Sequence, residues 1–284
     1  TKEELQIAIK LWCKNKEEAE KKYYHISMWD TSLITDMGDL FEYCNFNDDI
    51  SNWNVSNVKN MSGMFKGAKS FNQPLNEWNV SNITDMVSMF NMAESFNQDI
   101  SNWNVSNVKD MKWMFSDANS FNQNIGGWNV LNVINMENMF SYAIKFNQDL
   151  SSWDVSNVKN MSFMFENTKS FNHPLNNWNV SNVTNMNSMF NEAISFNQPL
   201  NDWDVSNVED MVNMFGDSNF NQPLNDWNVS NVKDMGGMFW DAKLFNQYIG
   251  GWDVSNVKNM YCMFKDSGMI ELPEWYLDND VCDD

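Results

Sequence analysis

The residues best suited to recognise a ligand are asparagines and aspartates that recur at one register of the chain. Each stands between a Trp and a Val, in a W-x-V pattern that returns about every 25 residues. The candidate ligand-binding positions are Asn54, Asn79, Asn104, Asn129, Asp154, Asn179, Asp204, Asn228 and Asp253. Aligned on neighbouring repeats, these side chains form a polar strip. Its amides could hydrogen-bond along their own ladder, or the strip could bind a ligand.

A second candidate chemistry involves three carboxylates in the eighth and ninth repeats. Asp202 and Asp226 share a column on neighbouring repeats, and Asp204 lies close by in sequence. Carboxylates about 5 to 9 Å apart could bind a hard cation or hydrolyse a glycoside. The calcium-repeat pattern GGxGxD is absent, however, so we expect these aspartates to be solvated. We expect no metal and no cofactor.

The sequence shows no residue pattern typical of nucleophilic catalysis. The two histidines, His25 and His173, have no triad-like neighbours in the repeat pattern. The chain also lacks a phosphate-cradling glycine motif and a paired C-x-x-C motif. We therefore expect that the protein is not an enzyme.

The four cysteines leave the disulfide state open. Cys44 replaces the small Ala of its column, which indicates a packed thiol. Cys13 lies near the N-terminus, and Cys262 and Cys282 lie near the C-terminus. A disulfide within either end is compatible with these positions, and four cysteines allow three full pairings.

A tenfold repeat must position all of these residues. Its clearest markers are the tryptophans Trp29, Trp53, Trp78, Trp103, Trp128, Trp153, Trp178, Trp203, Trp227 and Trp252. Most of the 22 Met and 20 Phe follow the same period. Such self-similarity is typical of a solenoid, in which neighbouring repeats bury one another's apolar faces. The Met columns then fill the core and have no redox or metal role.

Each repeat is predicted to contain one short strand and one helix. In the repeat beginning at Leu75, Trp78 and Val80 alternate with polar residues, as on a half-buried strand. Asn82 then serves as a helix N-cap, with Asp85 in the first turn. The apolar positions that follow have the spacing of one helical face: Ile83, Met86, Met89, Phe90 and Ala93.

These patterns predict an α/β fold, a leucine-rich-repeat-like solenoid of ten strand-turn-helix coils with a parallel sheet. We expect residues 1–25 to form a helical N-terminal cap, because Thr1 with Glu4 and Asn15 with Glu18 have capping-box spacing. Residues 26–268 form the ten-repeat solenoid, and residues 269–284 form a C-terminal cap and an acidic tail.

The charge balance excludes one class of partner. Lys and Arg number 18 and Asp and Glu number 38, which gives a formal charge of −20. Nucleic-acid binding needs a basic surface to neutralise phosphates, so we expect no nucleic acid as a partner. No stretch approaches the roughly 18 consecutive apolar residues of a membrane helix, so we also expect no membrane insertion of this chain.

The repeat pattern resembles a known family. The segment from Phe171 to Phe190, FNHPLNNWNVSNVTNMNSMF, is similar to the repeats of BspA-like leucine-rich-repeat surface proteins, the mycoplasma-lipoprotein type of repeat. The resemblance implies an α/β leucine-rich-repeat solenoid with roles in surface adhesion, host interaction or protein binding. It supplies no catalytic residues. The chain departs from ordinary leucine-rich repeats because Trp and Val occupy strand positions where Leu is usual.

Together these observations predict a non-enzymatic repeat scaffold that binds a protein or glycan on a host or neighbouring surface. The expected location is the cell surface, the extracellular space or a virion surface. One alternative is a structural component of an envelope or virion that has no specific ligand. A more distant alternative is a glycan-active enzyme.

Overall fold

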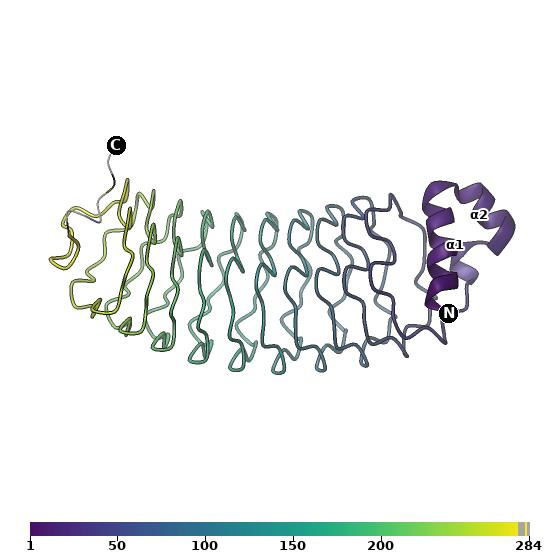
Figure 1. Ribbon diagram of the computed structural model, residues 1–284, viewed down its shortest axis with the longest axis horizontal. Helices are drawn as coiled ribbons and strands as arrows, with labels where there is room; N and C mark the ends of the chain where they lie inside the picture. The colour runs from purple at the N-terminus through teal and green to yellow at the C-terminus, as the bar shows by residue number, and fades with distance from the viewer. Residues whose placement is uncertain (278–281, 283–284) are drawn as a thin grey trace.

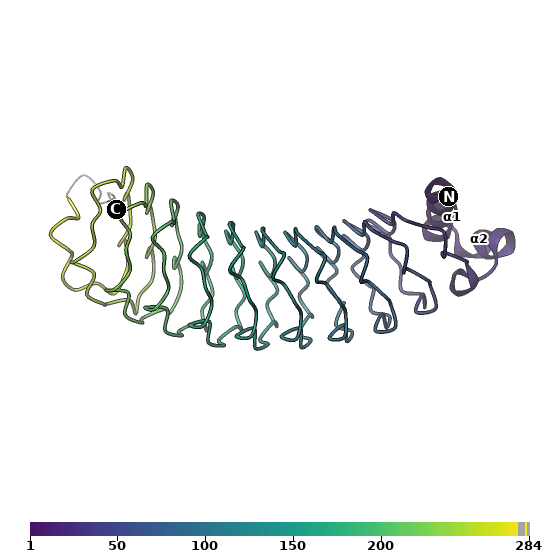
Figure 2. The same cartoon turned by 90° about the horizontal axis from the view of Figure 1, so that it is seen from below.

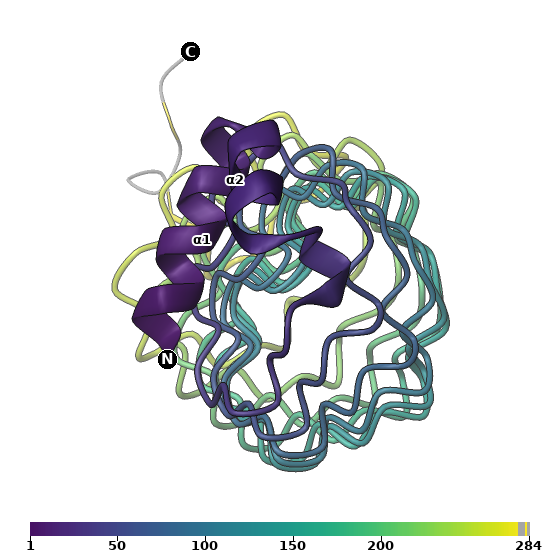
Figure 3. The ribbon, with the colours of Figure 1, turned by 90° about the vertical axis from the view of Figure 1, so that its right-hand side faces the viewer.

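The computed structural model describes residues 1–277 and residue 282. The chain forms an elongated, gently curved array of stacked coils with two helices at its N-terminal end (Figures 1 and 2). The regular elements are α1 (Lys2–Lys14), α2 (Lys16–Tyr23) and a short 3-10 helix, η1 (Ile26–Met28). Viewed along the array, successive coils lie nearly over one another (Figure 3).

The two N-terminal helices begin where the capping signals predict. Thr1 and Glu4 form a reciprocal capping box at the start of α1, and the Asn15 side chain accepts the N–H of Glu18 at the start of α2. Helix α1 buries Leu5 and Trp12. These local predictions are confirmed, because capping is decided by residues within one turn of the helix end.

The predicted α/β solenoid of strand-turn-helix coils with a parallel sheet is wrong. Among the described residues beyond Met28 there is no helix and no extended strand. Neighbouring repeats are joined instead by isolated parallel bridges, one for each pair. These bridges link Asp36, Asn60, Asp85, Asp110, Asn135, Asn160, Asn185, Asp210, Asp234 and Asn259 in sequence.

The segment that was expected to be helical is a run of tight turns. The N–H of Met89 bonds to the carbonyl of Met86 at 3.2 Å, whereas the N–H of Phe90 crosses to the carbonyl of Met114 in the next repeat at 2.9 Å. Ser88 and Met92 have φ values of 56° and 58°. An α-helix keeps its N–H bonds internal and its φ negative, so this alternation is incompatible with one.

The predicted apolar positions are nevertheless buried. Successive turns return side chains to the core at nearly the spacing of a helical face, so both conformations bury the same columns. Every member of the predicted helical face is 0% exposed: Ile83, Met86, Met89, Phe90 and Ala93. The pattern therefore identified the core correctly and the backbone conformation incorrectly.

Aromatic columns run the length of this core. Phe65 stacks on Phe71 of the same repeat with 4.1 Å between ring centroids, and on Phe90 of the next repeat at 5.4 Å. The indoles of Trp103 and Trp128 are nearly parallel, at 6.5 Å and an interplanar angle of 3°. Each repeat thus covers the aromatic face of its neighbour, which a single repeat could not bury alone.

Two disulfides lie at the two ends of the array. Cys13 of α1 is bonded to Cys44 of the first repeat, and Cys262 is bonded to Cys282. The interpretation of Cys44 as a packed free thiol is therefore wrong. Cys44 occupies a position for a small side chain that faces α1, and there it is bonded to Cys13. The other acidic-tail residues, 278–281 and 283–284, lie outside the described residues.

Candidate binding surface

The predicted polar strip lies on an exposed series of turns instead of a strand. All nine candidate residues are exposed: Asn54, Asn79, Asn104, Asn129, Asp154, Asn179, Asp204, Asn228 and Asp253. In each case a side-chain oxygen accepts the backbone N–H of the residue two positions later. The Ser81 N–H, for example, reaches Asn79 Oδ1 at 3.2 Å. These are Asx turns, which hold each side chain in one orientation.

Hydrogen bonding also sets the charge state of the acidic members of the strip. The hydroxyl and the backbone N–H of Ser156 both stabilise the Asp154 carboxylate and lower its pKa. Ser255 lowers the pKa of Asp253 in the same way. These two carboxylates are therefore held in the charged form, and the strip carries a negative charge at Asp154 and at Asp253.

The amide ladder between repeats lies in a different column from the one expected. Asn82, interpreted as a helix N-cap, instead donates its Nδ2–H to the carbonyl of Ser56 in the preceding repeat at 2.7 Å. The same bond recurs at Asn57, Asn107, Asn132, Asn157, Asn182, Asn207, Asn231 and Asn256. The N-cap interpretation is wrong because no helix follows.

Further ladders explain the high Asn content of the repeat. Asp85 was assigned to the first turn of a helix, but its Oδ1 accepts the N–H of Val87 at 3.0 Å in a second Asx turn. On the return segment, the N–H of Asn97 bonds to Asn72 Oδ1 of the preceding repeat at 2.9 Å. Asn side chains thus satisfy backbone groups that a regular sheet would have paired.

The two histidines have structural partners. The ring of His25 accepts the N–H of Ser27 at the start of η1 and lies edge-on to Trp12. His173 takes the place of the turn Gln, and its Nε2 lies 3.1 Å from the carbonyl oxygen of Asn147. The Ser27 hydroxyl also lies 2.8 Å from His25 Nδ1, whereas no hydroxyl among the described residues is hydrogen-bonded to the His173 ring.

Of the three carboxylates in the eighth and ninth repeats, Asp226 has an asparagine partner. Asp226 accepts from the side chain of Asn201 and donates its own N–H back to Asn201 Oδ1. In the part of the chain that the structure describes, no group of three His, Cys, Asp or Glu side chains is arranged to hold a metal ion. The possible convergence of Asp202, Asp204 and Asp226 on a metal is therefore not found.

Sequence reasoning missed a partly buried acidic ridge, formed at or beside the second left-handed position of several repeats by Asp117, Glu166, Glu192 and Asp217. Burial raises the pKa of Asp117 and of Glu166, and the carboxylates of Glu192 and Asp117 add to the effect at Glu166. The Ser141 hydroxyl donates to Glu166 at 2.9 Å. Asn167 Oδ1 is buried there without a hydrogen-bond partner. The recurrence of Asn and Asp at left-handed positions was the available sequence signal.

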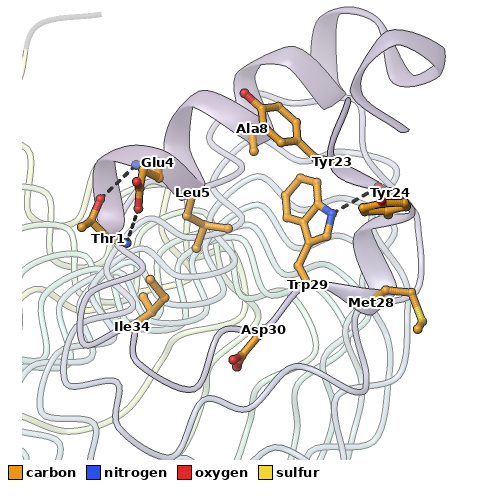
Figure 4. Close-up of a pocket in the computed structure, with 10 residues that line it drawn as sticks. All are labelled: Thr1, Glu4, Leu5, Ala8, Tyr23, Tyr24, Met28, Trp29, Asp30 and Ile34. Atoms are coloured by element: carbon orange, nitrogen blue, oxygen red, sulfur yellow. Dashed lines mark hydrogen bonds and ion pairs between the residues drawn. The ribbon is translucent and has the colours of Figure 1, made fainter. Parts of the chain in front are cut away.

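A cavity at the N-terminal end was also missed. It has a volume of about 540 Å³ and lies between α1 and the start of the first repeat. Leu5, Ala8 and Ile34 lie on one side and Trp29 on the other, with Asp30 below (Figure 4). A second cavity, of about 630 Å³, lies at the opposite end, between residues 246–250 and 269–274.

The family model described as "Mycoplasma protein of unknown function, DUF285" matches residues 13–126, 99–198 and 173–275. No curated protein matches the chain. A chain from the solved structure "Crystal structure of TLR13-ssRNA13 complex" is similar over 76% of this chain and 42% of its own length, at 8% identity and a TM-score of 0.27. A likeness this low carries no argument.

The helices give no sign of a membrane span. Over residues 1–277 and 282, none is long and apolar enough to cross a bilayer.

Proposed function

The chain belongs to the family described as Mycoplasma protein of unknown function, DUF285, and from this premise we propose that it is a non-enzymatic repeat scaffold that binds a protein or glycan. The proposed binding face is the polar strip. Its location would be a cell surface, the extracellular space or a virion surface. The resemblance of the repeats to BspA-like surface proteins supports the further proposal of a role in adhesion or host interaction.

The observation that carries this proposal is the uniform immobilisation of the strip. Each strip residue accepts a backbone hydrogen bond within its own turn, as between Asn104 Oδ1 and the Ser106 N–H at 3.1 Å. Side chains fixed in this way lose little conformational entropy when a partner binds. The amide NH₂ groups project from exposed positions and are suited to donate to carbonyl or hydroxyl oxygens of a ligand.

The test replaces three consecutive strip residues and measures capture of surface molecules. In the triple variant Asn54→Ala, Asn79→Ala and Asn104→Ala, we expect capture from a matrix or host-cell surface extract to fall severalfold. A second variant, Asn54→Asp with Asn104→Asp, retains the turn-forming oxygen, because Asp occupies this column at Asp154 and Asp204, but removes two amide donors, so we expect it to lose capture and to keep its fold. Thermal unfolding of both variants separates loss of binding from loss of fold.

Two outcomes would contradict the proposal. Capture unchanged in a folded triple-Ala variant would exclude the strip as the binding face. The absence of capture by the parent protein would favour the alternative function, a structural spacer of an envelope or virion. The stacked ladders between repeats are compatible with that alternative because they make the array rigid.

A further inference from the structure

The tripeptide Asn-x-Ser/Thr, the acceptor motif for asparagine-linked sugars, recurs in three columns of the repeat. It begins at Asn54, Asn60, Asn79, Asn82, Asn104, Asn160, Asn179, Asn182 and Asn228. A transferase must form a bond to the side-chain nitrogen of the Asn. The hydrogen bonds of that nitrogen in each column therefore decide which copies of the motif can react in the folded protein.

In the polar strip, the side-chain nitrogen of the motif is free. Asn79 Oδ1 accepts the N–H of Ser81 at 3.2 Å and the Ser81 hydroxyl at 2.7 Å, so the amide oxygen is turned inward. Among the described residues, no group accepts a hydrogen bond from Nδ2 of any strip residue that begins the motif. These residues are all exposed: Asn54, Asn79, Asn104, Asn179 and Asn228.

In the second column, the same nitrogen links two repeats. Asn82 Nδ2 donates to the carbonyl oxygen of Ser56 at 2.7 Å, and Asn182 Nδ2 donates to that of Ser156 at 2.7 Å. A transferase would have to break this bond before the nitrogen could react. We therefore expect these two copies of the motif to be inert in the folded chain.

In the third column, the nitrogen is bonded to a carboxylate. Asn60 Nδ2 donates to Asp36 Oδ1 at 3.1 Å, and Asn160 Nδ2 donates to Glu137 Oε2 at 3.0 Å. Both Asn residues are half-buried, and both form the parallel bridges between repeats. Because hydrogen bonds to a charged acceptor are the stronger kind, we expect these copies to be inert as well.

The spacing of the repeats limits the size of the sugar. Asn54, Asn79 and Asn104 lie on three consecutive repeats. The stacked indoles beside the strip show how close such repeats are, since the ring centroids of Trp103 and Trp128 are 6.5 Å apart. A branched oligosaccharide on one repeat would cover the acceptor on the next. The spacing therefore favours a single sugar at each position.

We propose that the five strip asparagines that begin the motif are acceptors for a single hexose, supplied by a nucleoside diphosphate hexose and an asparagine glycosyltransferase. The anomeric carbon bonds to Asn Nδ2 as its bond to the phosphate oxygen breaks. The nucleoside diphosphate leaves with that electron pair, and one amide proton passes to a base of the transferase. The inference goes beyond the proposed function because it concerns a covalent change of the strip and needs no bound partner.

The experiment incubates the folded full chain with UDP-glucose and a glucosyltransferase specific for Asn-x-Ser/Thr. Peptide mass spectrometry then locates each added hexose. We expect hexose at the five strip positions and at least about tenfold lower occupancy at Asn60, Asn82, Asn160 and Asn182. The same reaction on peptides from a protease digest should modify both sets, because digestion removes the hydrogen bonds between repeats.

Two variants test the part played by the hydroxyl in the motif. Ser81→Ala removes the hydroxyl and keeps the backbone N–H that closes the turn, so hexose should be lost at Asn79 alone. Leu131→Ser is the matched gain of a site. The Leu131 N–H already bonds to Asn129 Oδ1 at 3.2 Å, so this variant adds only the missing hydroxyl and should create a sixth acceptor at Asn129.

Three results would overturn the proposal. The first is a folded chain without hexose on the strip when its digest is modified. The second is hexose on Asn82 or Asn182 of the folded chain at the level of the strip. The third is a digest that is itself unmodified, since the motif is then no acceptor. The proposed function fails separately, through unchanged surface capture by strip variants that were never exposed to the transferase.

Discussion

The Nε1–H of Trp178 donates a hydrogen bond of 3.0 Å to the carbonyl oxygen of Leu150 in the preceding repeat. The same bond recurs from Trp53 to Trp252, so each indole anchors its repeat to the one before it. Beyond this series, Trp275 stacks on Trp252, but its buried Nε1 has no partner among the described residues. The indole therefore serves both as core and as a polar link between repeats.

Replacing this indole tests the link. Trp178→Phe retains a stacked ring but shrinks it and removes one of the two donors to the Leu150 carbonyl, which keeps the Trp153 N–H at 3.0 Å. Trp178 and Leu150 are at most 3% exposed. We expect the free energy of unfolding to fall by about 2 to 3 kcal/mol, measured by urea denaturation. The control is Trp113→Phe, at an indole that is 38% exposed. Equal losses for the two variants would show that the indole hydrogen bond contributes nothing of its own.

Two glycines test the left-handed turns. Gly63 has a φ of +60°, and an added Cβ would lie 2.1 Å from Asp39 Oδ1. Gly127 lies outside the left-handed region, and no heavy atom lies within 4 Å of its added Cβ. We expect Gly63→Ala to cost about 1 kcal/mol, because Ser88 shows that a side chain is tolerated at the equivalent position. Gly127→Ala should be neutral or slightly stabilising in thermal unfolding.

The reverse order of stabilities for these two glycine variants would be inconsistent with the turn assignment. It would indicate that the segment around Gly63 adopts negative φ in solution, as the expected helix requires.

The acidic ridge predicts a pH dependence of stability. Burial raises the pKa of Glu166 above its ordinary value, so the native state favours the protonated carboxyl. The contribution of Glu166 to the free energy of unfolding is therefore fully present at pH values below the pKa that this residue has in the unfolded chain. It is lost as the pH rises through the pKa of Glu166 in the folded protein. Glu166→Gln should raise the melting temperature at neutral pH and have little effect near pH 4.5, the ordinary Glu value.

The matched control for this variant is Glu42→Gln, at the same position of an earlier repeat. Glu42 pairs with Lys66 at 2.9 Å, so neutralising it should lower the melting temperature modestly at neutral pH. A lower melting temperature for both variants at neutral pH would contradict the assigned burial of Glu166.

The sequence alone determined the repeat, the helix caps and the buried columns. The Trp and Phe columns were predictable because a period of about 25 residues leaves each repeat with an apolar face that its neighbour must cover. The caps at Thr1 and Asn15 were predictable because they depend on residues three positions away. Exposure of the polar strip followed from its position between buried Trp and Val residues.

Tertiary structure decided where the backbone N–H groups find their acceptors. A helix and a run of turns bury the same side chains, so the apolar spacing from Ile83 to Ala93 could not distinguish them. The Phe90 N–H bonds to Met114 because the next repeat places a carbonyl beside it, a relationship invisible within one repeat. The disulfide between Cys13 and Cys44 and the cavity beside Trp29 likewise depend on how α1 packs against the first coil.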